Sequence, residues 1–480
     1  MNLSRIVLLV AVFLFDARVS DAQARLTRSD SALVGRVLLA EDRRDSTDRA
    51  LSEALAHRDP RLRLLAQRAR WRIRDPLFVA RDSLPSLPPA FSWPQPTWRL
   101  RYCALAAQRN NCDALRAALA DSVWPVRFRA MSFVTPACAT DDSLALTLRQ
   151  WVDALPVATS TRARGDVSWH AAARAIVAFA KIRPNEARWR TARMATHQQW
   201  QVRMYAARAA AVLADTARLR MLARDRNDDV KEAAIDALSK LTGHADDELY
   251  LATLTADGAQ VVRAAAIALK GSPRSDVAAA ANAAFDRWVQ RGNASERDAR
   301  VALLEAAGRP ASDDQPPPLR VSLPPRAVQL ALGEPVRIRV TMAPASGGGS
   351  FVVRLRGDNA PMMAARILEL VRQGYYDNGN WHRVGHDFVI QGAGPGSNEY
   401  VGHRDYLRDE LGNLPHTRGT VGMSTRAHDT GDAQWFINLK DNLSLIRDYT
   451  VFAEVEEGIE VVDDILEGDV ILTMREVRKP

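Results

Sequence analysis

From about residue 31 to residue 307, apolar residues recur with the period of an α-helix. The clearest unit spans 228–238, where apolar side chains at 230, 233, 234, 237 and 238 form one stripe of a helix. Similar stripes start at Leu62, Leu100, Val126, Val202 and Val262. One longer gap between them leaves room for a further repeat. Self-similarity at a period of about 30 residues predicts stacked helix pairs.

After residue 326 the period changes from helix to strand. Runs typical of strands occupy 336–342, 350–356, 381–384, 388–392, 420–424, 434–437, 451–455 and 470–477, and runs typical of helices occupy 361–373 and 458–465. This order predicts an eight-stranded closed β-barrel capped at its ends by two helices.

Proline-rich stretches mark the breaks in this pattern. The segment 308–326 contains Pro310, Pro316–Pro318 and Pro324–Pro325, which cannot continue a helix. We therefore predict a signal peptide at 1–24, an α-helical repeat domain at 25–307, a proline-rich linker at 308–326 and a β domain at 327–480. A second proline-rich stretch, 84–89, is expected to form a loop or an irregular repeat junction.

The first residues have the pattern of a secretory signal peptide. One basic residue, Arg5, precedes a ten-residue apolar run at 6–15, and a polar stretch then ends in small residues near Ala22 and Ala24. The run is too short for a stable membrane anchor, and no later stretch is apolar enough to span a bilayer. The sequence therefore predicts a periplasmic or secreted protein with no integral membrane segment after cleavage.

Charge is unevenly distributed along the 480 residues, whose net charge is +8. Residues 326–480 contain 17 Lys+Arg and 22 Asp+Glu, or −5, so the rest carries 48 against 35, or +13. A basic half is one sign of nucleic-acid binding. Here, however, the arginines are spread among acids along helical faces, so we favour a solvated face and expect no nucleic-acid partner. The opposite charges also predict two separable modules whose contact is partly electrostatic.

Three cysteines occur in the chain, at Cys103, Cys112 and Cys138. In an oxidising compartment this odd number allows one internal disulfide and one remaining thiol. Their spacing fits no zinc site. Cys103 and Cys112 are placed to pair between neighbouring helices, and buried free thiols are an equally good interpretation.

The stretch 381–392 contains the most distinctive chemistry. Two apolar runs flank a Gly-His-Asp break, which predicts strand, turn and strand. In such a hairpin Arg383 and Gln391 project on one side of the sheet, with Phe388 as an apolar floor. A cation, an amide and an aromatic ring make a site without a nucleophile or metal ligands. An ordinary hairpin with a solvated arginine is the alternative.

Two resemblances add to this interpretation. The helical repeats resemble the HEAT family of α-solenoids, which implies a curved stack and a possible protein partner on its surface. The segments 381–392, 418–424, 433–437 and 449–452, with their spacings, resemble the cyclophilin family of peptidyl-prolyl cis-trans isomerases. The whole chain is thus expected to be a HEAT-like solenoid followed by a cyclophilin-like barrel.

The cyclophilin resemblance implies roles for particular residues. It assigns catalysis to Arg383, Phe388, Gln391, Gln434 and Phe436, and substrate binding to Val389, Thr425, Leu445 and Tyr449. Thr425 stands where the family usually has asparagine, and Tyr449 stands where many members have histidine. The resemblance implies no cofactor and no metal.

The reaction that the resemblance implies suits these residue types. Rotation about an X–Pro bond has a barrier of about 18–20 kcal/mol and returns electron density to the prolyl nitrogen. A permanently charged guanidinium can stabilise that nitrogen while an apolar pocket holds the ring. We expect proline-containing unfolded or flexible polypeptides as substrates, with the repeats as a protein-binding scaffold. The alternative is a non-catalytic protein that only binds proline-containing segments.

Overall fold

The computed structural model describes residues 26–80, 89–157, 161–315 and 322–477. The predicted signal peptide lies outside these residues, as do most of the proline-rich stretch at 84–89 and part of the predicted linker. Within the described residues, no helix is both long and apolar enough to cross a membrane.

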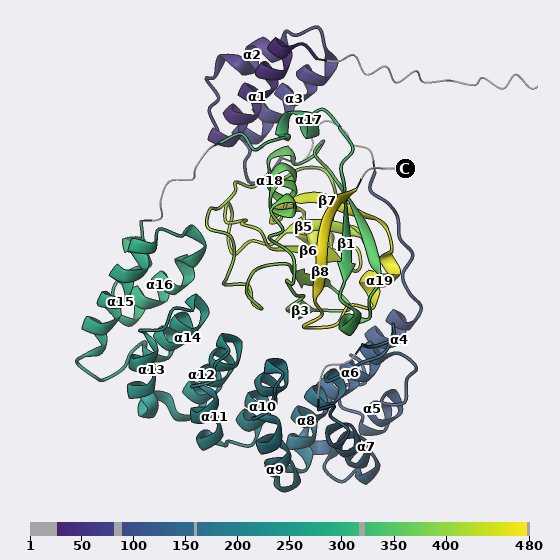
Figure 1. Cartoon of the computed structure of the whole chain (residues 1–480), viewed down its shortest axis with the longest axis vertical. Coiled ribbons are helices and arrows are strands. Elements are labelled where there is room, and N and C mark those ends of the chain that lie inside the picture. Colours follow the sequence, from purple (N-terminus) through teal and green to yellow (C-terminus); the bar gives the residue numbers. More distant parts are fainter. Residues whose placement is uncertain (1–25, 81–88, 158–160, 316–321, 478–480) are drawn as a thin grey trace, which may run out of the picture.

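Three parts of the chain meet around one curled β-sheet (Figure 1). An N-terminal bundle consists of α1 (Arg28–Arg43), α2 (Arg49–Leu55) and α3 (Pro60–Arg74). A helical array, α4 to α16, curves around the opposite side of the sheet. The C-terminal domain, residues 322–477, lies between them and contains all the strands.

The helical array has two layers. Its helices are α4 (Trp98–Ala104), α5 (Cys112–Ala118), α6 (Trp124–Phe133), α7 (Asp142–Asp153), α8 (His170–Ile182), α9 (Pro184–Met194), α10 (Trp200–Val212), α11 (Thr216–Leu222), α12 (Asp228–Thr242), α13 (Asp247–Thr253), α14 (Ala259–Leu269), α15 (Val277–Arg291) and α16 (Arg297–Ala306), with short 3-10 turns η1 (Pro136–Cys138), η2 (Gly243–Asp246), η3 (Ala294–Glu296) and η4 (Ala311–Asp313). Helices α8, α10, α12, α14 and α16 pack in succession as one layer. Helices α9, α11, α13 and α15 lie beside them as the second.

Helix α12 shows how the repeats pack. The Asn227 side chain caps it by accepting hydrogen bonds from the main-chain N–H groups of Asp229 and Val230. The expected stripe is buried at Val230, Ala234 and Leu238, and Ile235 beside it is buried as well. Ala233 and Ala237 of the stripe are half-buried, so the buried face is shifted toward Ile235. Helix α12 packs against both α10 and α14.

In several repeats a basic residue directly follows the first apolar residue of the stripe, and in three of them it has a structural role. Arg63, Arg127 and Arg203 each donate to a main-chain carbonyl five or six residues earlier, in the turn before their helix. Arg203 also forms a two-bond ion pair with Asp225. These cations therefore hold each helix to its preceding turn.

The disulfide differs from the expected pairing. Cys112, at the start of α5, is bonded to Cys138 in η1, with 5.6 Å between their Cα atoms. Cys103 is free and exposed on α4. Both the expected Cys103–Cys112 pair and its alternative, buried free thiols, are thus wrong. Stacking α5 beside α6 brings Cys112 to the turn that follows α6 and leaves Cys103 outside.

The C-terminal domain contains one eight-stranded sheet in the order β3-β4-β6-β5-β7-β2-β1-β8. Its elements are α17 (Ala327–Ala331), β1 (Arg337–Met342), η5 (Pro344–Ser346), β2 (Ser350–Leu355), α18 (Pro361–Arg372), β3 (Arg383–Val384), β4 (Val389–Gly392), β5 (Thr420–Met423), β6 (Trp435–Asn438), η6 (Leu443–Arg447), β7 (Val451–Glu457), α19 (Ile459–Asp463) and β8 (Ile471–Val477). The strands other than β3, and the helices α18 and α19, agree closely with the predicted ranges, whereas α17 was not expected. All strand pairs along the sheet are antiparallel.

The sheet is a curled half-barrel, which corrects the expected closed barrel. Within the described residues, β3 and β8 end the strand order and share no ladder. β3 has two residues, and the chain just before it touches the start of β8 through an isolated Asn380–Val470 bridge and a bond from the Trp381 N–H to the Asp469 carbonyl. A strand this short cannot supply the row of hydrogen bonds that closure requires.

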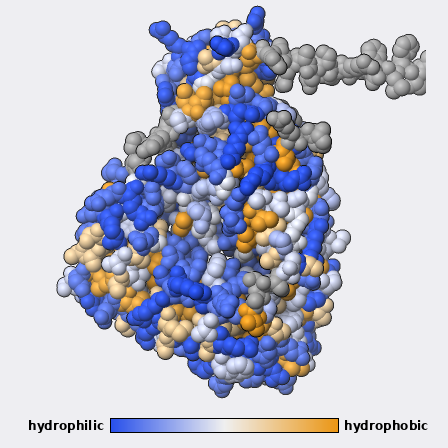
Figure 2. Space-filling view, in the orientation of Figure 1, coloured by the Kyte–Doolittle hydropathy of each residue, from blue (hydrophilic) through white to orange (hydrophobic). Residues whose placement is uncertain are grey.

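The N-terminal bundle and the C-terminal domain share one hydrophobic core. Leu33, Val37 and Leu62 belong to the same buried apolar cluster as Leu330 and Met363. In Figure 2 hydrophobic residues also show at the surface of the bundle, at the top of the view. The contact between the two ends of the chain is therefore apolar as well as charged.

A buried ion cluster lies in this contact. Glu41 accepts from Arg72 at 2.8 Å and from Arg68 at 3.1 Å. Burial raises the pKa of Glu41, but the charges of the two arginines outweigh it and hold that pKa below its usual value. Arg72 also donates to three main-chain carbonyls of the C-terminal domain, those of Asn359 (2.8 Å), Glu410 (2.9 Å) and Leu411 (2.7 Å).

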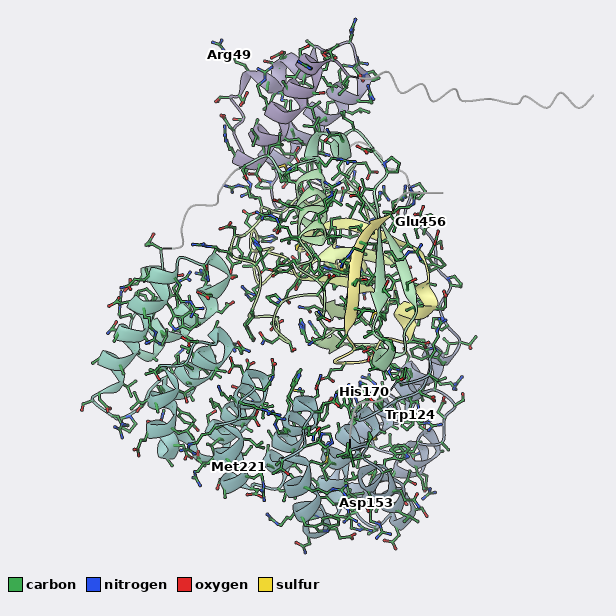
Figure 3. All side chains as sticks on the ribbon, viewed as in Figure 1. Arg49, Trp124, Asp153, His170, Met221 and Glu456 are labelled. Atoms are coloured by element: carbon green, nitrogen blue, oxygen red, sulfur yellow. A yellow bond between two sulfur atoms is a disulfide. The ribbon has the colours of Figure 1, made fainter. Side chains whose placement is uncertain are left out.

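The array contacts the C-terminal domain through the loop that precedes β8. Glu467 accepts hydrogen bonds from Arg174 at 2.8 Å and Tyr205 at 2.7 Å, and its carbonyl accepts from His170 Nε2 at 2.9 Å. Leu466 is part of the buried core of the array. In Figure 3 His170 lies on the side of the array that faces the sheet, whereas Asp153 and Met221 lie away from it.

Candidate functional site

β3 and β4 form the predicted hairpin. Arg383 is opposite Gln391, and Val384 is opposite Ile390. Directly paired residues project from the same face of a sheet, and Arg383 Nη1 donates to Gln391 Oε1 at 3.2 Å. The pairing of cation and amide read from the sequence is thus confirmed.

A small pocket of about 70 Å³ opens beside this pair. It is lined by Arg383, Phe388, Val389, Gln391, Glu399, Ser424, Thr425, Phe436, Leu445 and Tyr449. The structure therefore brings together every predicted site residue except Gln434. Glu399 and Ser424 line the pocket as well and were not expected from the sequence.

Polar groups on one wall of the pocket are fixed in orientation. Gln391 is buried and donates from Nε2 to the Ser424 hydroxyl at 2.8 Å, while its carbonyl oxygen receives the Arg383 guanidinium. The guanidinium carbon lies 5.8 Å from the centre of the Phe388 ring. Among the described residues Arg383 has no ion-pair partner, so its other N–H groups are available to a ligand.

Aromatic packing fixes the apolar floor. The buried Phe436 ring stacks on His416 at 5.7 Å and meets Tyr449 edge-on at 5.5 Å. A side chain at Gly422 would approach the Phe436 ring to 2.4 Å, so glycine there gives the ring its space. The pocket thus has a preformed apolar base with a cation at its edge.

A neutral histidine supports this floor. His416 Nδ1 accepts from Asn438 Nδ2 at 3.1 Å, which leaves Nε2–H to donate to the Tyr449 carbonyl at 3.0 Å. Burial lowers the pKa of His416 to about 4. The ring therefore stays uncharged at neutral pH and acts as a structural support.

Comparison with known proteins agrees with this geometry. A family model described as cyclophilin type peptidyl-prolyl cis-trans isomerase/CLD matches residues 339–479. Peptidyl-prolyl cis-trans isomerase B of Escherichia coli (strain K12) is 38% identical over 129 residues, which are 24% of this chain and 78% of that protein. The chain belongs to the cyclophilin family.

Other relatives agree with this assignment. The peptidyl-prolyl cis-trans isomerase of Helicobacter pylori (strain ATCC 700392 / 26695) is 32% identical over 127 residues, or 26% of this chain and 78% of the relative. A solved cyclophilin type isomerase from Cryptosporidium parvum aligns with 31% of this chain and all of its own, with 21% identity and a TM-score of 0.29. The family model and the curated relatives show that the C-terminal domain is a cyclophilin domain, and the chain is a peptidyl-prolyl cis-trans isomerase whose substrates are proline-containing peptides.

Gln434 lies behind the cyclophilin pocket. It is buried, and its Nε2 donates to the carbonyls of Asn398 at 2.9 Å and Val401 at 2.7 Å. These bonds hold the loop 395–402, which carries Glu399 to the pocket. Glu399 was missed because this loop is glycine-rich and has no periodicity. Its position after the hairpin in the sequence also did not show that its side chain turns back to the pocket.

The tip of the catalytic hairpin is inserted into the helical array. His386 is buried between Trp98 and Tyr102 of α4, with 5.8 Å between its ring centre and each of theirs. The next residue, Asp387, lies 3.8 Å from Arg129. The sequence showed His386 only as part of the Gly-His-Asp turn, because nothing local marks a contact with a helix almost 300 residues earlier. The array therefore clamps the hairpin that carries Arg383.

This clamp predicts acid sensitivity. Burial, together with the charges of Arg174 and Arg99, lowers the pKa of His386 to about 3, below its usual 6.5. The unfolded chain therefore binds a proton that the folded chain excludes, and stability present above pH 6.5 is lost as the pH falls toward 3. His386→Phe keeps an aromatic ring without titrating. Between pH 7 and 4.5 we expect the wild type to lose about 2–3 kcal/mol more than this variant.

Urea unfolding at the two pH values measures this difference. Equal pH dependence of the free energy of unfolding in both proteins would show that His386 is not held neutral by the clamp.

Proposed function

We propose that this isomerase catalyses X–Pro rotation in unfolded or flexible protein substrates outside the cytoplasm, with the helical array as a HEAT-type scaffold. The observation that carries the proposal is the guanidinium of Arg383 at the edge of an apolar pocket, fixed by Gln391. No covalent step or proton transfer is needed, so a site built from a cation, amides and aromatic rings fits the reaction.

The residue roles follow from the chemistry of rotation. The twisted peptide bond loses resonance, and its nitrogen lone pair becomes a hydrogen-bond acceptor. Arg383 donates to that nitrogen and stabilises the twisted state more than the planar one. The Gln391 carbonyl holds the guanidinium in place, so that less side-chain entropy is lost when the substrate binds.

The apolar lining holds the proline ring during this motion. Val389, Phe436 and Leu445 supply contact area, and the edge-on Tyr449 ring fixes the plane of Phe436. Thr425 follows β5 at the opening, where its main chain is placed to bond an extended peptide. Gln434 acts indirectly by holding the loop that carries Glu399.

The two-layer packing of the array supports a HEAT-type scaffold. The array contacts the cyclophilin domain at points far apart along its length, from the His386 clamp at α4 to η3, where the Ala294 N–H donates to the Arg404 carbonyl at 3.0 Å. The scaffold therefore holds the catalytic domain in place. Any partner of the scaffold binds where this contact leaves open surface.

A location outside the cytoplasm has two supports. The first 24 residues have the pattern of a signal peptide. The Cys112–Cys138 disulfide is of the kind that persists in oxidising compartments. Cell fractionation followed by N-terminal sequencing tests this. A cytoplasmic protein that keeps residues 1–24 would refute the location and leave the activity unaffected.

Refolding of a protein limited by one X–Pro bond tests the activity on protein substrates. The uncatalysed phase takes tens to hundreds of seconds, and we expect micromolar enzyme to shorten it at least tenfold. An added, permanently unfolded protein should compete for the enzyme and slow this catalysis. If the enzyme accelerates a tetrapeptide and leaves the refolding phase unchanged, unfolded proteins are not its substrates.

A further inference from the structure

A second hollow lies beside the catalytic pocket, between the cyclophilin domain and the array. Its volume is about 730 Å³, within the range of about 300–1,000 Å³ that is usual for ligand sites. The array side includes Asp257, Gln260 and Glu296, and the cyclophilin side includes Tyr400, Val401 and Arg404. Both halves of the chain are needed to form it.

The loop 395–402 separates this hollow from the catalytic pocket. Glu399 lines the pocket, whereas its neighbours Tyr400 and Val401 line the hollow. A substrate that crosses this loop therefore passes from one site into the other.

The array holds the loop in place. Asn398 Nδ2 donates to Asp229 Oδ1 at 3.1 Å, and the Arg263 guanidinium lies 3.8 Å from the centre of the Tyr400 ring. Arg426 donates to the carbonyls of Glu399 and, at 2.9 Å, Ser295. Contacts from the array and from the cyclophilin domain thus hold the loop 395–402 in position without a substrate.

Polar groups on the array side of the hollow lack partners. Gln260, in the first turn of α14, is 5% exposed and has no hydrogen bond with any described residue. Glu296 Oε2 is buried and also without a partner, although Oε1 lies 3.0 Å from Arg291. Gly258, the N-cap residue before α14, has no side chain to cap the helix, so within the described residues the first N–H groups of α14 have no side-chain cap. Buried polar groups normally have hydrogen-bond partners.

We propose that a polypeptide bound at the X–Pro site continues over the loop 395–402 into this hollow, where Gln260 and the first turn of α14 bond its main chain. An amide side chain can donate to a peptide carbonyl and accept from a peptide N–H. The free N–H groups at the N-terminal end of the helix donate to a further peptide carbonyl. Because these bonds are to the main chain, the array favours long extended substrates whatever their sequence. This inference rests on the isomerase activity and deepens it.

Two substrates test the proposal on the full chain. One is a proline tetrapeptide, which is too short to leave the catalytic pocket. The other is a disordered 16-residue peptide with the same four residues at its centre, followed by NMR exchange. We expect the wild type to have a several-fold lower KM for the long peptide. Gln260→Met, which keeps the volume of the side chain, should raise that KM about fivefold with little change in kcat.

Two further variants keep the test decisive. Asn293→Trp places a bulky ring in the hollow and should raise the same KM even if Gln260→Met does not fold. Gln290→Met, exposed on α15, is the matched control and should behave as the wild type. Equal KM values of the wild type for both peptides, or no change in the folded variants, would overturn the proposal. If the wild type isomerises neither peptide, the isomerase activity itself is refuted.

Discussion

Arg383→Ala should lower kcat/KM for a proline tetrapeptide by about 100- to 1,000-fold, the usual effect of removing one donor that stabilises a transition state. The side chain lies at the edge of the pocket and its nearest fixed contact is Gln391. Because no core packing depends on it, the fold should stay intact. Coupled peptide kinetics give the rate, and circular dichroism checks the fold.

Two other variants sharpen this result. Arg383→Lys keeps the charge but loses the planar fork of donors, so it should recover only part of the activity. Arg447→Ala, exposed on η6, removes an arginine near the pocket and should leave turnover unchanged. Full activity of folded Arg383→Ala would show that this residue is not the donor that stabilises the twisted peptide bond.

Arg72→Met should destabilise the protein by about 3–5 kcal/mol, the usual cost of removing one partner from a buried ion pair. The methionine fills similar space but leaves Glu41 with Arg68 alone. It also leaves the carbonyls of Asn359, Glu410 and Leu411 without their donor. Chemical denaturation measures the loss.

The control for this variant is Arg70→Met on the same helix, where the arginine is exposed. Exposed positions without special contacts change stability by about 0.5 kcal/mol or less. A loss below about 1 kcal/mol in Arg72→Met would mean that the buried cluster does not hold the N-terminal bundle to the cyclophilin domain.

Local patterns predicted the elements that carry the catalytic groups. The alternation around a Gly-His-Asp turn was enough to place Arg383 and Gln391 on one side of a hairpin, because strand period fixes which side chains share a face. The direct pairing of the two residues came from the structure. The same patterns could not show that β3 has only two residues and that the sheet stays open. Closure depends on how neighbouring segments bend, and no local period reports that.

Contacts between distant parts of the chain could not be predicted from the sequence. Nothing near His386 indicates Trp98, and nothing near Arg72 indicates Glu410. The opposite charges of the two halves predicted ion pairs in general, and the pair of Arg174 and Glu467 is one of them. They could not predict that Leu466 beside it enters the core of the array, since charge gives no information on apolar burial.

The loop at 466–469 has a consequence for how the chain folds. Leu466 lies about 160 residues beyond the end of α16, so the core of the array gains this residue only after the C-terminal domain has been made. The N-terminal bundle, made first, likewise waits for strands made last. Contacts this far apart slow folding and leave apolar surface open to aggregation. The helical parts and the C-terminal domain are therefore expected to complete their folding together, once residues 466–469 have joined the array.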